Sequence, residues 1–494
     1  MSQIKVTNLT FSYEGDWREI FKNASFQLDT DWKLGFCGRN GRGKTTFLNL
    51  LMGKFEYSGT ILTDKIFEYF PFSVDISQNT LDILQAISPN AELWQVQKEL
   101  SKLEVGENVL YRPFATLSEG ERTKTMLAGL FLRENNFLLI DEPTNHLDKA
   151  ARETVAKYLN TKTGFILVSH DRAFLDGCID HVLSINRANI EVTKGNFSAW
   201  FQRKKEQDEL ELSQNRKLKK DISRLEESAA RAANWSDKVE KSKIGAYDKG
   251  HVGHMAAKMM KRAKNTENLR NKAVEEKSKL LKNIEAANTE LKIYPLKHHN
   301  RRLLTLEDVS ISYDSVYVCK NINLTLEHGE RLAIIGGNGT GKSSILKLIN
   351  NFDEKSTKME YNGKISLAGG LKISYVAQDA TFLQGKLSDY ISQFSLDEPL
   401  FKAILRKLDF SRDQFDKPIE EYSAGQKKKL MIANSLTTQA HLYIWDEPLN
   451  YIDVLSRIQI EELIQNYSPT MLFVEHDADF CKNAATKILQ LDVN

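Results

Sequence analysis

The chain contains the same ordered set of short motifs twice. "GRNGRGKTT" at 38–46 returns as "GGNGTGKSS" at 336–344, and "FLLIDEPTNHLD" at 137–148 returns as "LYIWDEPLNYID" at 442–453. "LVSHD" at 167–171 returns as "FVEHD" at 473–477. Because the motif order is constant and the offset stays between 298 and 306 residues, we interpret the chain as one domain duplicated.

Each copy is predicted to fold as an α/β domain. Apolar runs such as "GFILVS" and "RLAIIG" are typical of strands buried on both faces, and helical patterns follow them. The first copy is expected to span residues 1–195 and the second 301–494. Residues 196–300 join them.

The connecting stretch is basic, whereas the two copies are mildly acidic. Residues 201–300 hold 24 Lys and Arg against 15 Asp and Glu, an excess of nine positive charges. The whole chain has a net charge of only +2, so the remainder carries −7. This asymmetry indicates that the middle of the chain meets a polyanion.

Within this stretch the pattern predicts a helical hairpin, because no proline interrupts residues 197–294. Residues from about 254 to 291 are rich in helix formers. Two helices of about 35 residues would make a hairpin roughly 50 Å long. The spacing of a coiled-coil seam is found at Leu218, Ile222, Leu225, Ala229 and Ala232.

The turn of this hairpin, residues 233–254, combines lysines and glycines with two aromatic rings. Trp235 and Tyr247 offer flat surfaces that suit splayed RNA bases, and Tyr247 is predicted to probe the partner. A solvated, charged linker is the alternative interpretation. The lysines expected to contact phosphates are Lys238, Lys241, Lys243 and Lys249.

Both copies carry a GxxxxGK[ST] phosphate-binding loop. Its glycines let backbone N–H groups face a phosphate at the positive end of the following helix. The lysine is predicted to reach the β- and γ-phosphates of ATP, and the hydroxyl after it to bind Mg²⁺. The nucleotide-binding residues expected in the two loops are Gly38, Asn40, Gly41, Gly43, Lys44, Thr45, Thr46, Gly336, Asn338, Gly339, Gly341, Lys342, Ser343 and Ser344.

An Asp–Glu pair ends an apolar run in each copy. Asp141 and Asp446 suit the Mg²⁺ shell, whereas Glu142 and Glu447 are placed to orient or deprotonate an attacking water. A strand-end cap is the structural alternative, which a phosphate loop in the same domain disfavours.

"LSEGE" at 117–121 and "YSAGQ" at 422–426 resemble the signature motif of the ABC ATPases. The resemblance implies ATP hydrolysis and a signature that covers the nucleotide. Residues matching the family's switch histidine, D-loop aspartate, adenine-stacking aromatic and signature are His170, His476, Asp148, Asp453, Tyr13, Tyr313, Ser118, Gly120, Ser423, Gly425 and Gln426.

The head-to-tail closure of this family implies two composite sites, each using both cassettes. In site two, Gln378 would join the Mg²⁺ shell. In the first copy Phe72 occupies the equivalent position, so site one is expected to bind or hydrolyse ATP differently. Site one would combine Lys44, Asp141, Glu142 and His170 with Ser423 and Gly425. Site two would combine Lys342, Gln378, Asp446, Glu447 and His476 with Ser118 and Gly120.

Tandem cassettes joined by "KGHVGHMAAKMMKRAK" resemble the ABC-F proteins, which act on ribosomes. Phe72 lies 46 positions before Ser118, and Gln378 lies 45 before Ser423, leaving no room for the arm of housekeeping members. "DTDWKLGFCGRNGRGKTT" is similar to Lsa-type members of the antibiotic-resistance branch. This resemblance implies binding at the tRNA exit site of the ribosome, contacts with large-subunit rRNA and P-site tRNA, and loss of bound lincosamides, pleuromutilins or streptogramin A.

Two other functions stay open: a general ABC-F translation factor, and the tandem ATPase subunit of a sugar importer. No segment reaches the ~18 apolar residues of a membrane span, and the start lacks a signal sequence. We therefore expect a cytoplasmic, ribosome-associated protein with ATP and Mg²⁺ as cofactors and no DNA partner. Four widely spaced cysteines without a CxxC pair predict buried thiols.

Overall fold

The computed structural model describes residues 2–14, 19–144, 147–185, 190–211, 291–313, 316–337, 339–351 and 359–491, with single positions between 213 and 223. Two compact units result: Met1–Ser198 with Asn288–Asn494, and Ala199–Ala287. Outside the described residues lie most of the predicted hairpin, all of its tip lysines, Tyr247, and Asn338 of the second phosphate loop.

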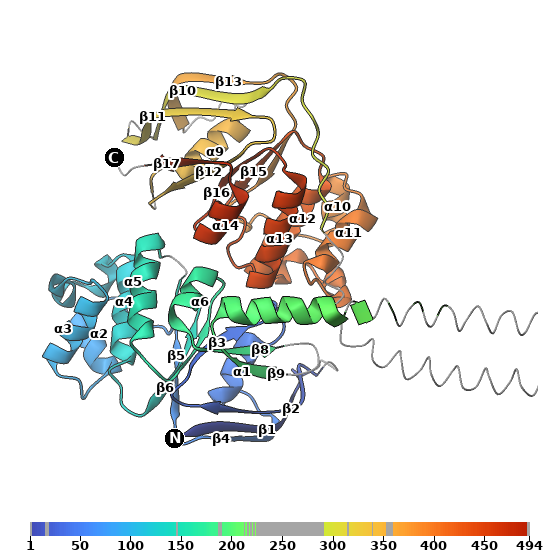
Figure 1. The fold of residues 1–494 in the computed structure, drawn as a ribbon. Helices are drawn as coiled ribbons and strands as arrows, with labels where there is room; N and C mark the ends of the chain where they lie inside the picture. Colours follow the sequence, from blue (N-terminus) through green and yellow to red (C-terminus); the bar gives the residue numbers. More distant parts are fainter. Residues whose placement is uncertain are drawn as a thin grey trace, which may run out of the picture. The chain divides into compact units, whose positions relative to one another are not determined.

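The first cassette begins at β1 and ends at β9 (Figure 1). Its strands are β1 Gln3–Phe11, β2 Phe21–Asp29, β3 Lys33–Cys37, β4 Ser58–Leu62, β5 Ile66–Phe70, β6 Asn136–Asp141, β7 Phe165–Val168, β8 His181–Ile185 and β9 Ile190–Lys194. Its helices are α1 Lys44–Leu51, α2 Thr80–Ile87, α3 Leu93–Lys102, α4 Glu119–Leu130, α5 Lys149–Asn160 and α6 Arg172–Cys178.

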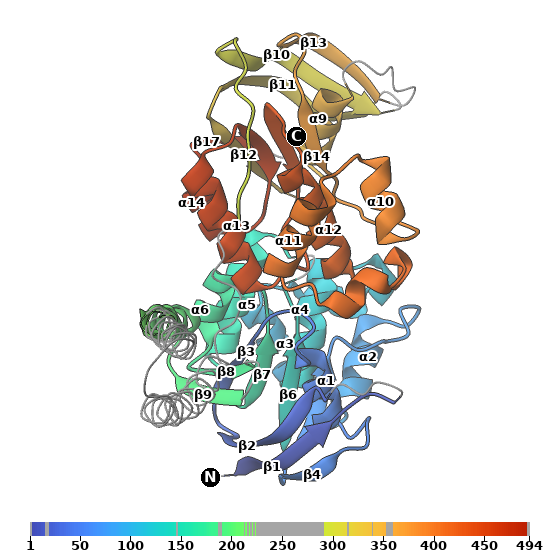
Figure 2. The same cartoon turned by 90° about the vertical axis from the view of Figure 1, so that its right-hand side faces the viewer.

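The second cassette repeats this order of elements, except that its described residues contain no counterpart of β9. Its strands are β10 Arg302–Tyr313, β11 Val316–Glu327, β12 Arg331–Gly336, β13 Met359–Leu367, β14 Ile373–Val376, β15 Leu442–Asp446, β16 Met471–Val474 and β17 Lys487–Leu491. Its helices are α9 Lys342–Asn350, α10 Leu387–Gln393, α11 Glu398–Lys407, α12 Ala424–Thr437, α13 Val454–Tyr467 and α14 Ala478–Ala484, with α10 to α12 grouped together in Figure 2.

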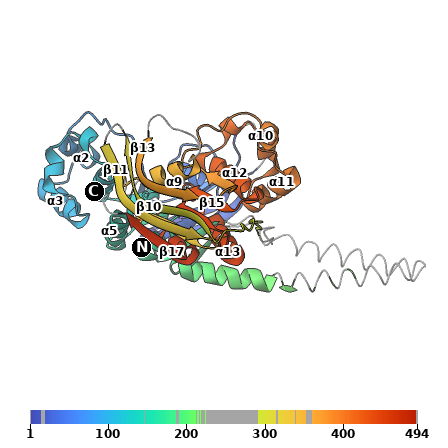
Figure 3. The ribbon, with the colours of Figure 1, turned by 90° about the horizontal axis from the view of Figure 1, so that it is seen from above.

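Each cassette pairs an antiparallel sheet with a largely parallel one. The antiparallel sheets have the orders β2-β1-β4 and β11-β10-β13, and the second is seen from above in Figure 3. The parallel sheets have the orders β5-β6-β7-β3-β8-β9 and β14-β15-β16-β12-β17, with only β9 antiparallel to its neighbour among these described pairs. The predicted α/β class is confirmed.

Alternate residues of the second cassette's parallel strands are buried against different layers. Ile444 of β15 and Ile334 of β12 belong to the core shared with α9 and the antiparallel sheet. Trp445, which follows Ile444, and Ala333, which precedes Ile334, belong to the core shared with α10 to α14. Because successive side chains of a strand point to opposite faces, both faces of this sheet are buried.

The helix after each phosphate loop lies between the two sheets of its cassette. In the first cassette Phe47 and Leu48 of α1 pack in one core with β1, β2, β3, β6 and β7. Ile345 and Leu346 of α9 occupy the same place in the second cassette. This packing fixes the N-terminus of each helix at the carboxyl ends of the parallel strands, where ligands bind in open α/β sheets.

All four cysteines of the chain are buried, and none forms a disulfide. This agrees with the predicted buried thiols. Burial raises the pKa of the Cys178 thiol, which disfavours its reactive thiolate.

Glu99 of α3 joins this helix to the end of α5 in the first cassette. Its carboxylate accepts hydrogen bonds from the Tyr158 hydroxyl at 2.6 Å and the Lys102 ammonium at 2.7 Å, and it pairs with Lys162. Burial would raise the pKa of Glu99, but the hydrogen bonds from Lys102, Lys162 and Tyr158 lower it to about 2. The ionised carboxylate therefore stabilises the folded cassette.

We predict that Glu99→Gln lowers the free energy of unfolding by about 1.5–3 kcal/mol at pH 7, since it weakens charged hydrogen bonds. A depressed pKa stabilises the fold above the unfolded-state pKa, and this contribution is lost as pH falls toward 2. The wild-type advantage should therefore be full at pH 7 and shrink below about pH 4.5 in urea titrations. The exposed Glu153→Gln on α5 is the control; an equal loss there, or a loss independent of pH, would contradict this prediction.

Candidate functional site

Each phosphate loop wraps around its own lysine. The Lys44 Nζ donates to the Gly38 carbonyl at 2.6 Å and to the Asn40 Oδ1 at 3.3 Å. In the second loop the Lys342 Nζ donates to the carbonyls of Gly336 at 3.0 Å and Gly337 at 2.7 Å. Both lysines thus lie inside the turn, at the N-terminus of the following helix.

Glycine is required where each loop enters its helix. Gly43 has φ of 92°, and a Cβ there would lie 2.6 Å from the Ile20 side chain. Gly341 repeats this conformation with φ of 87° and would meet Val318 at 3.0 Å. A side chain at either position would be strained and would displace a neighbour, so the loop geometry depends on these glycines.

The aspartates at the ends of β6 and β15 face the hydroxyls that follow the lysines. The Thr45 hydroxyl lies 3.4 Å from the Asp141 Oδ2, and the Ser343 hydroxyl donates to the Asp446 Oδ1 at 2.9 Å. The other oxygen of Asp446, Oδ2, is buried without a hydrogen-bond partner among the described residues. A buried carboxylate oxygen beside a hydroxyl is a donor set that fits Mg²⁺.

The neighbouring glutamates adopt an unusual backbone conformation. Glu142 and Glu447 have φ of 51° and 45°, in the left-handed region that glycine favours. Their backbone N–H groups still pair with the adjacent strand, on Val168 at 2.9 Å and Val474 at 3.0 Å. Such strain costs on the order of 1–3 kcal/mol and is typical of functional sites, where it aims a side chain.

Each glutamate contacts the predicted switch histidine of its cassette. The His170 Nε2 lies 3.2 Å from the Glu142 Oε1, and the His476 Nε2 lies 3.3 Å from the Glu447 Oε1. Burial lowers the pKa of His170 well below its usual value, and the Lys44 ammonium adds to this. The lowered pKa favours the neutral form of His170, and the Glu142 Oε1 has no hydrogen-bond partner among the described residues.

The two glutamates differ in their other partners. Glu447 also accepts from the Gln378 Nε2 at 3.0 Å and the Asn450 Nδ2 at 2.7 Å. Burial raises the pKa of Glu447, but its contacts with His476, Gln378 and Asn450 lower it to about 2. Burial raises the pKa of Glu142 to about 8, the Asp141 carboxylate adds to the rise, and Arg457 opposes it. Gln378 is thus one of the contacts that lower the pKa of Glu447, whereas burial and the Asp141 carboxylate raise the pKa of Glu142.

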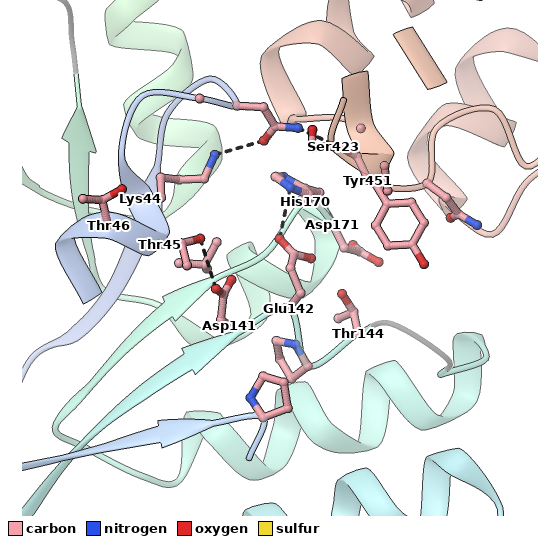
Figure 4. A pocket seen from close by; sticks show the side chains of 18 of the residues that line it. Lys44, Thr45, Thr46, Asp141, Glu142, Thr144, His170, Asp171, Ser423 and Tyr451 are labelled. Atoms are coloured by element: carbon pink, nitrogen blue, oxygen red, sulfur yellow. Dashed lines mark hydrogen bonds and ion pairs between the residues drawn. The ribbon is translucent and has the colours of Figure 1, made fainter. Parts of the chain in front are cut away.

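A cavity of about 740 Å³ surrounds the first phosphate loop and draws on both cassettes (Figure 4). The first cassette contributes its predicted site-one residues, Lys44, Asp141, Glu142 and His170. The second contributes the signature residues Ser423, Ala424 and Gly425, together with Asn450, Tyr451 and Arg457. The structure therefore brings together all the residues predicted for site one.

The first phosphate loop also bonds directly to the second cassette. The Asn40 side chain donates to the Tyr451 carbonyl at 2.8 Å, and its backbone N–H lies 3.5 Å from the Asp453 Oδ2. Asp453 in turn pairs with the Lys429 Nζ at 2.7 Å, with both side chains buried. Burial lowers the pKa of Lys44, and Asp453 is the charge that most opposes this. The predicted D-loop aspartate of one cassette thus acts electrostatically on the lysine of the other.

Two arginines of this loop reach the helical part of the second cassette. The Arg42 guanidinium lies 3.0 Å from the Asp409 carboxylate, and the Arg39 Nη1 donates to the Lys407 carbonyl at 3.3 Å. The GxxxxGK[ST] pattern does not predict these contacts, because Arg39 and Arg42 occupy two of its x positions. The repeat did offer a signal, since the second loop has Gly337 and Thr340 at the same positions.

Site two is not assembled in the same way. A cavity of about 480 Å³ around the second phosphate loop includes Lys342, Ser343, Gln378, Glu447 and His476. Among its described lining residues, those of the first cassette are Leu147 and Arg152. Ser118 and Gly120 instead line a separate cavity of about 410 Å³, with Glu121 and Asp148. The two halves of the predicted site two therefore line different cavities, and Leu147 borders both.

The signature serines also cap their helices. Ser423 accepts from the Gln426 backbone N–H at 3.3 Å, and the Gln426 side chain accepts from the Ser423 N–H at 2.8 Å. Ser118 and Glu121 form the same capping box on α4. Serine and a residue with a side-chain carbonyl at this spacing therefore have a structural role beside any contact with nucleotide.

The predicted adenine-stacking tyrosines differ in exposure. Tyr13 lines the site-one cavity, is 42% exposed, and its hydroxyl lies 2.8 Å from the Thr46 hydroxyl. Tyr313 packs against the core of the second cassette, and its hydroxyl donates to Ser344 at 3.3 Å. The greater exposure of Tyr13 makes it the better placed of the two to meet a flat ring.

The family model described as ABC transporter matches residues 21–145 and 319–450, which together exceed half of the chain. The chain therefore belongs to the ABC transporter family, and it is an ATPase of the ABC type with two nucleotide-binding domains. In the part of the chain that the structure describes, no helix has both the length and the apolar composition needed to span a bilayer.

Within this family, the chain is similar over nearly its whole length to ABC-F proteins. It is 27% identical to the ribosome protection protein VmlR of Bacillus subtilis, covering 99% of this chain and 87% of the relative. It is 28% identical to the erythromycin resistance ATP-binding protein MsrA of Staphylococcus epidermidis, covering 93% and 92%. It is also 25% identical to ABC transporter F family member 5 of Arabidopsis thaliana, covering 99% and 75%.

Among solved structures, the archaeal ribosome recycling factor aABCE1, in complex with the ribosomal stalk protein aP1, shares the fold. The TM-score is 0.62 at 19% identity, and the match covers 98% of this chain and 87% of that chain.

We predict that Arg42→Ala and Asp409→Ala each weaken ATP-driven closure of the cassettes. The double variant should lose no more closure than either single variant. The coupling energy should be on the order of 0.5–3 kcal/mol, as for charged side chains in direct contact. Fluorescence transfer between the cassettes during ATP titration measures closure. Lys364→Ala, which removes an exposed ion pair with Glu307, is the control; additive losses would show that Arg42 and Asp409 act separately.

Proposed function

We propose that this protein is an ABC-F-type ribosome protection ATPase. It would bind the ribosome at the tRNA exit site and dislodge lincosamides, pleuromutilins and streptogramin A from the peptidyl-transferase centre. The main support is its full-length similarity to VmlR and MsrA, combined with a site-one cavity built from both cassettes. The excess of positive charge in residues 201–300 suits a large-subunit rRNA and tRNA partner.

In this proposal ATP closes the cassettes because each nucleotide is contacted from both sides. At site one, Lys44 and the loop N–H groups would hold the phosphates, while Ser423 and Gly425 would cover them. Mg²⁺, held by Thr45 and Asp141 at site one and by Ser343, Gln378 and Asp446 at site two, would neutralise charge on the phosphates. A ligand that bridges two domains shifts their equilibrium toward the closed state, and its hydrolysis removes that bias.

The glutamates are proposed to serve as the general bases. Glu142 or Glu447 would accept a proton from the water that attacks the γ-phosphorus, as the bond to the β-phosphate oxygen breaks and ADP leaves. His170 and His476 would hold the glutamates in place through the contacts of 3.2 and 3.3 Å. The tip residues Lys238, Lys241, Lys243, Tyr247 and Lys249 are proposed to contact rRNA in the ribosome-bound state.

We predict that the double variant Glu142→Gln, Glu447→Gln binds ATP, stays closed and remains on ribosomes. Amide side chains keep the shape of the carboxylates but cannot accept the proton. Co-sedimentation with ribosomes should therefore depend on ATP and fall steeply with salt, because phosphate contacts release counterions. A variant that retains ATP but does not co-sediment would contradict the ribosomal function.

The same variant with Lys44→Ala and Lys342→Ala added is the control, since it should not hold ATP. Measurements in cells then separate two alternative functions. A general ABC-F translation factor would bind ribosomes without changing susceptibility to the three drug classes. The ATPase subunit of a sugar importer would associate with membranes that carry its partner subunits and not with ribosomes.

A further inference from the structure

Lys428 of α12 is a buried cation that no motif accounts for. The residue is 2% exposed, and its ammonium donates to the Ala377 carbonyl at 2.9 Å and to the Glu447 carbonyl at 3.0 Å. Ala377 directly follows β14 and Glu447 directly follows β15, and these strands are neighbours in the parallel sheet. One ammonium therefore bridges the carboxyl ends of two adjacent strands.

The two bridged carbonyls belong to the residues around the reacting carboxylate of site two. Ala377 precedes Gln378, whose Nε2 donates to the Glu447 Oε2 at 3.0 Å. Glu447 itself has a left-handed backbone, with φ of 45°, which needs support from its surroundings. Lys428 thus holds the backbone on both sides of the Gln378–Glu447 hydrogen bond.

The place of Lys428 on its helix connects this contact with the other nucleotide site. Ser423, Ala424 and Gly425, at the start of α12, line the site-one cavity. Lys428 follows Gly425 by three positions, so it lies about one turn further along the same helix. A shift of α12 against site one would therefore move the ammonium at site two.

The first cassette lacks both parts of this arrangement. The repeat aligns Ser118 with Ser423, which places Thr123 at the position of Lys428. A threonine side chain is too short to span two strand ends and carries no ammonium, and Phe72 stands at the position of Gln378. Lysine and glutamine occur together in one cassette and are both replaced in the other, as expected if the lysine serves the glutamine.

We propose that Lys428 is a positioning residue for ATP hydrolysis at site two, and that it links this site to the helix whose first turn covers site one. This inference rests on the proposed role of Glu447 as the base. The Lys428 ammonium donates to the carbonyls of Ala377 and Glu447 and so fixes the backbone from which Gln378 and Glu447 project. Misplacing a reacting group by about 1 Å can lower a rate by roughly a hundredfold.

The test measures ATP turnover of the full chain in a Glu142→Gln background, in which site two alone can hydrolyse. Lys428→Met should lower kcat roughly tenfold to a hundredfold and leave KM for ATP unchanged. Lys427→Met, at the adjacent and more exposed position, is the control and should not change kcat. A retained kcat in Lys428→Met, or a raised KM with kcat retained, would overturn the proposal.

A second measurement separates positioning from damage to the helix. In a Lys342→Ala background, in which site two should not hold ATP, a fluorescent ATP analogue should bind site one equally well with Lys428 present and with Lys428→Met, because the start of α12 is intact. Loss of this binding would assign the effect to the fold of α12 and overturn the proposal. If Lys428→Met does not fold, Lys428→Thr, which copies the first cassette, decides by the same criteria.

ATP turnover of Glu447→Gln in the Glu142→Gln background distinguishes the role of Glu447 from that of Lys428. If Glu447→Gln leaves turnover in the Glu142→Gln background unchanged, the proposed role of Glu447 fails, and the inference about Lys428 fails with it. If Glu447→Gln abolishes turnover but Lys428→Met does not lower it, only the role of Lys428 fails.

Discussion

The contact between the first phosphate loop and the second cassette is the interaction on which the arrangement of site one depends. A phosphate loop at a helix N-terminus binds anions on one side only, and a second surface is needed to enclose a nucleotide. Here Asn40 bonds to the Tyr451 carbonyl, and Asp453 places a negative charge near Lys44. Gly425 packs so closely that a Cβ would lie 3.0 Å from the Asn40 side chain. The signature, the D-loop and the phosphate loop therefore form one packed interface.

The two sites share motifs but differ in the residues around them. Site one has arginines in its phosphate loop that reach the second cassette, and its glutamate has a raised pKa. Site two has a glutamate held by Gln378, Asn450 and His476, and its signature half lies in another cavity. The two copies thus differ: the first phosphate loop contacts the opposite cassette, and the second glutamate has three side-chain partners.

Sequence reasoning predicted the fold class and placed the motifs well, because each motif corresponds to a fixed physical task at a strand end or helix start. Lys44, the adjacent pair Asp141 and Glu142, and His170 come from three separate segments, yet the repeat and the family resemblance predicted that they share one site. The pairing of Arg42 with Asp409 could not be predicted, since it depends on how two domains meet. Lys428 was missed for a related reason: a lysine in a basic run gives no sign of burial until the neighbouring strands are seen.

The most direct test of composite sites is to substitute Gly425 in the second cassette and locate bound nucleotide in the first. A Cβ at Gly425 would lie 2.4 Å from the Tyr451 carbonyl oxygen, so Gly425→Ala disturbs the interface without touching Lys44. Photolabelling with an azido-ATP, followed by peptide mass mapping, assigns the label to each cassette. Composite sites predict that the label decreases on the first cassette's peptides and persists on those of the second. Loss from the second cassette alone, or no change in either, would contradict them.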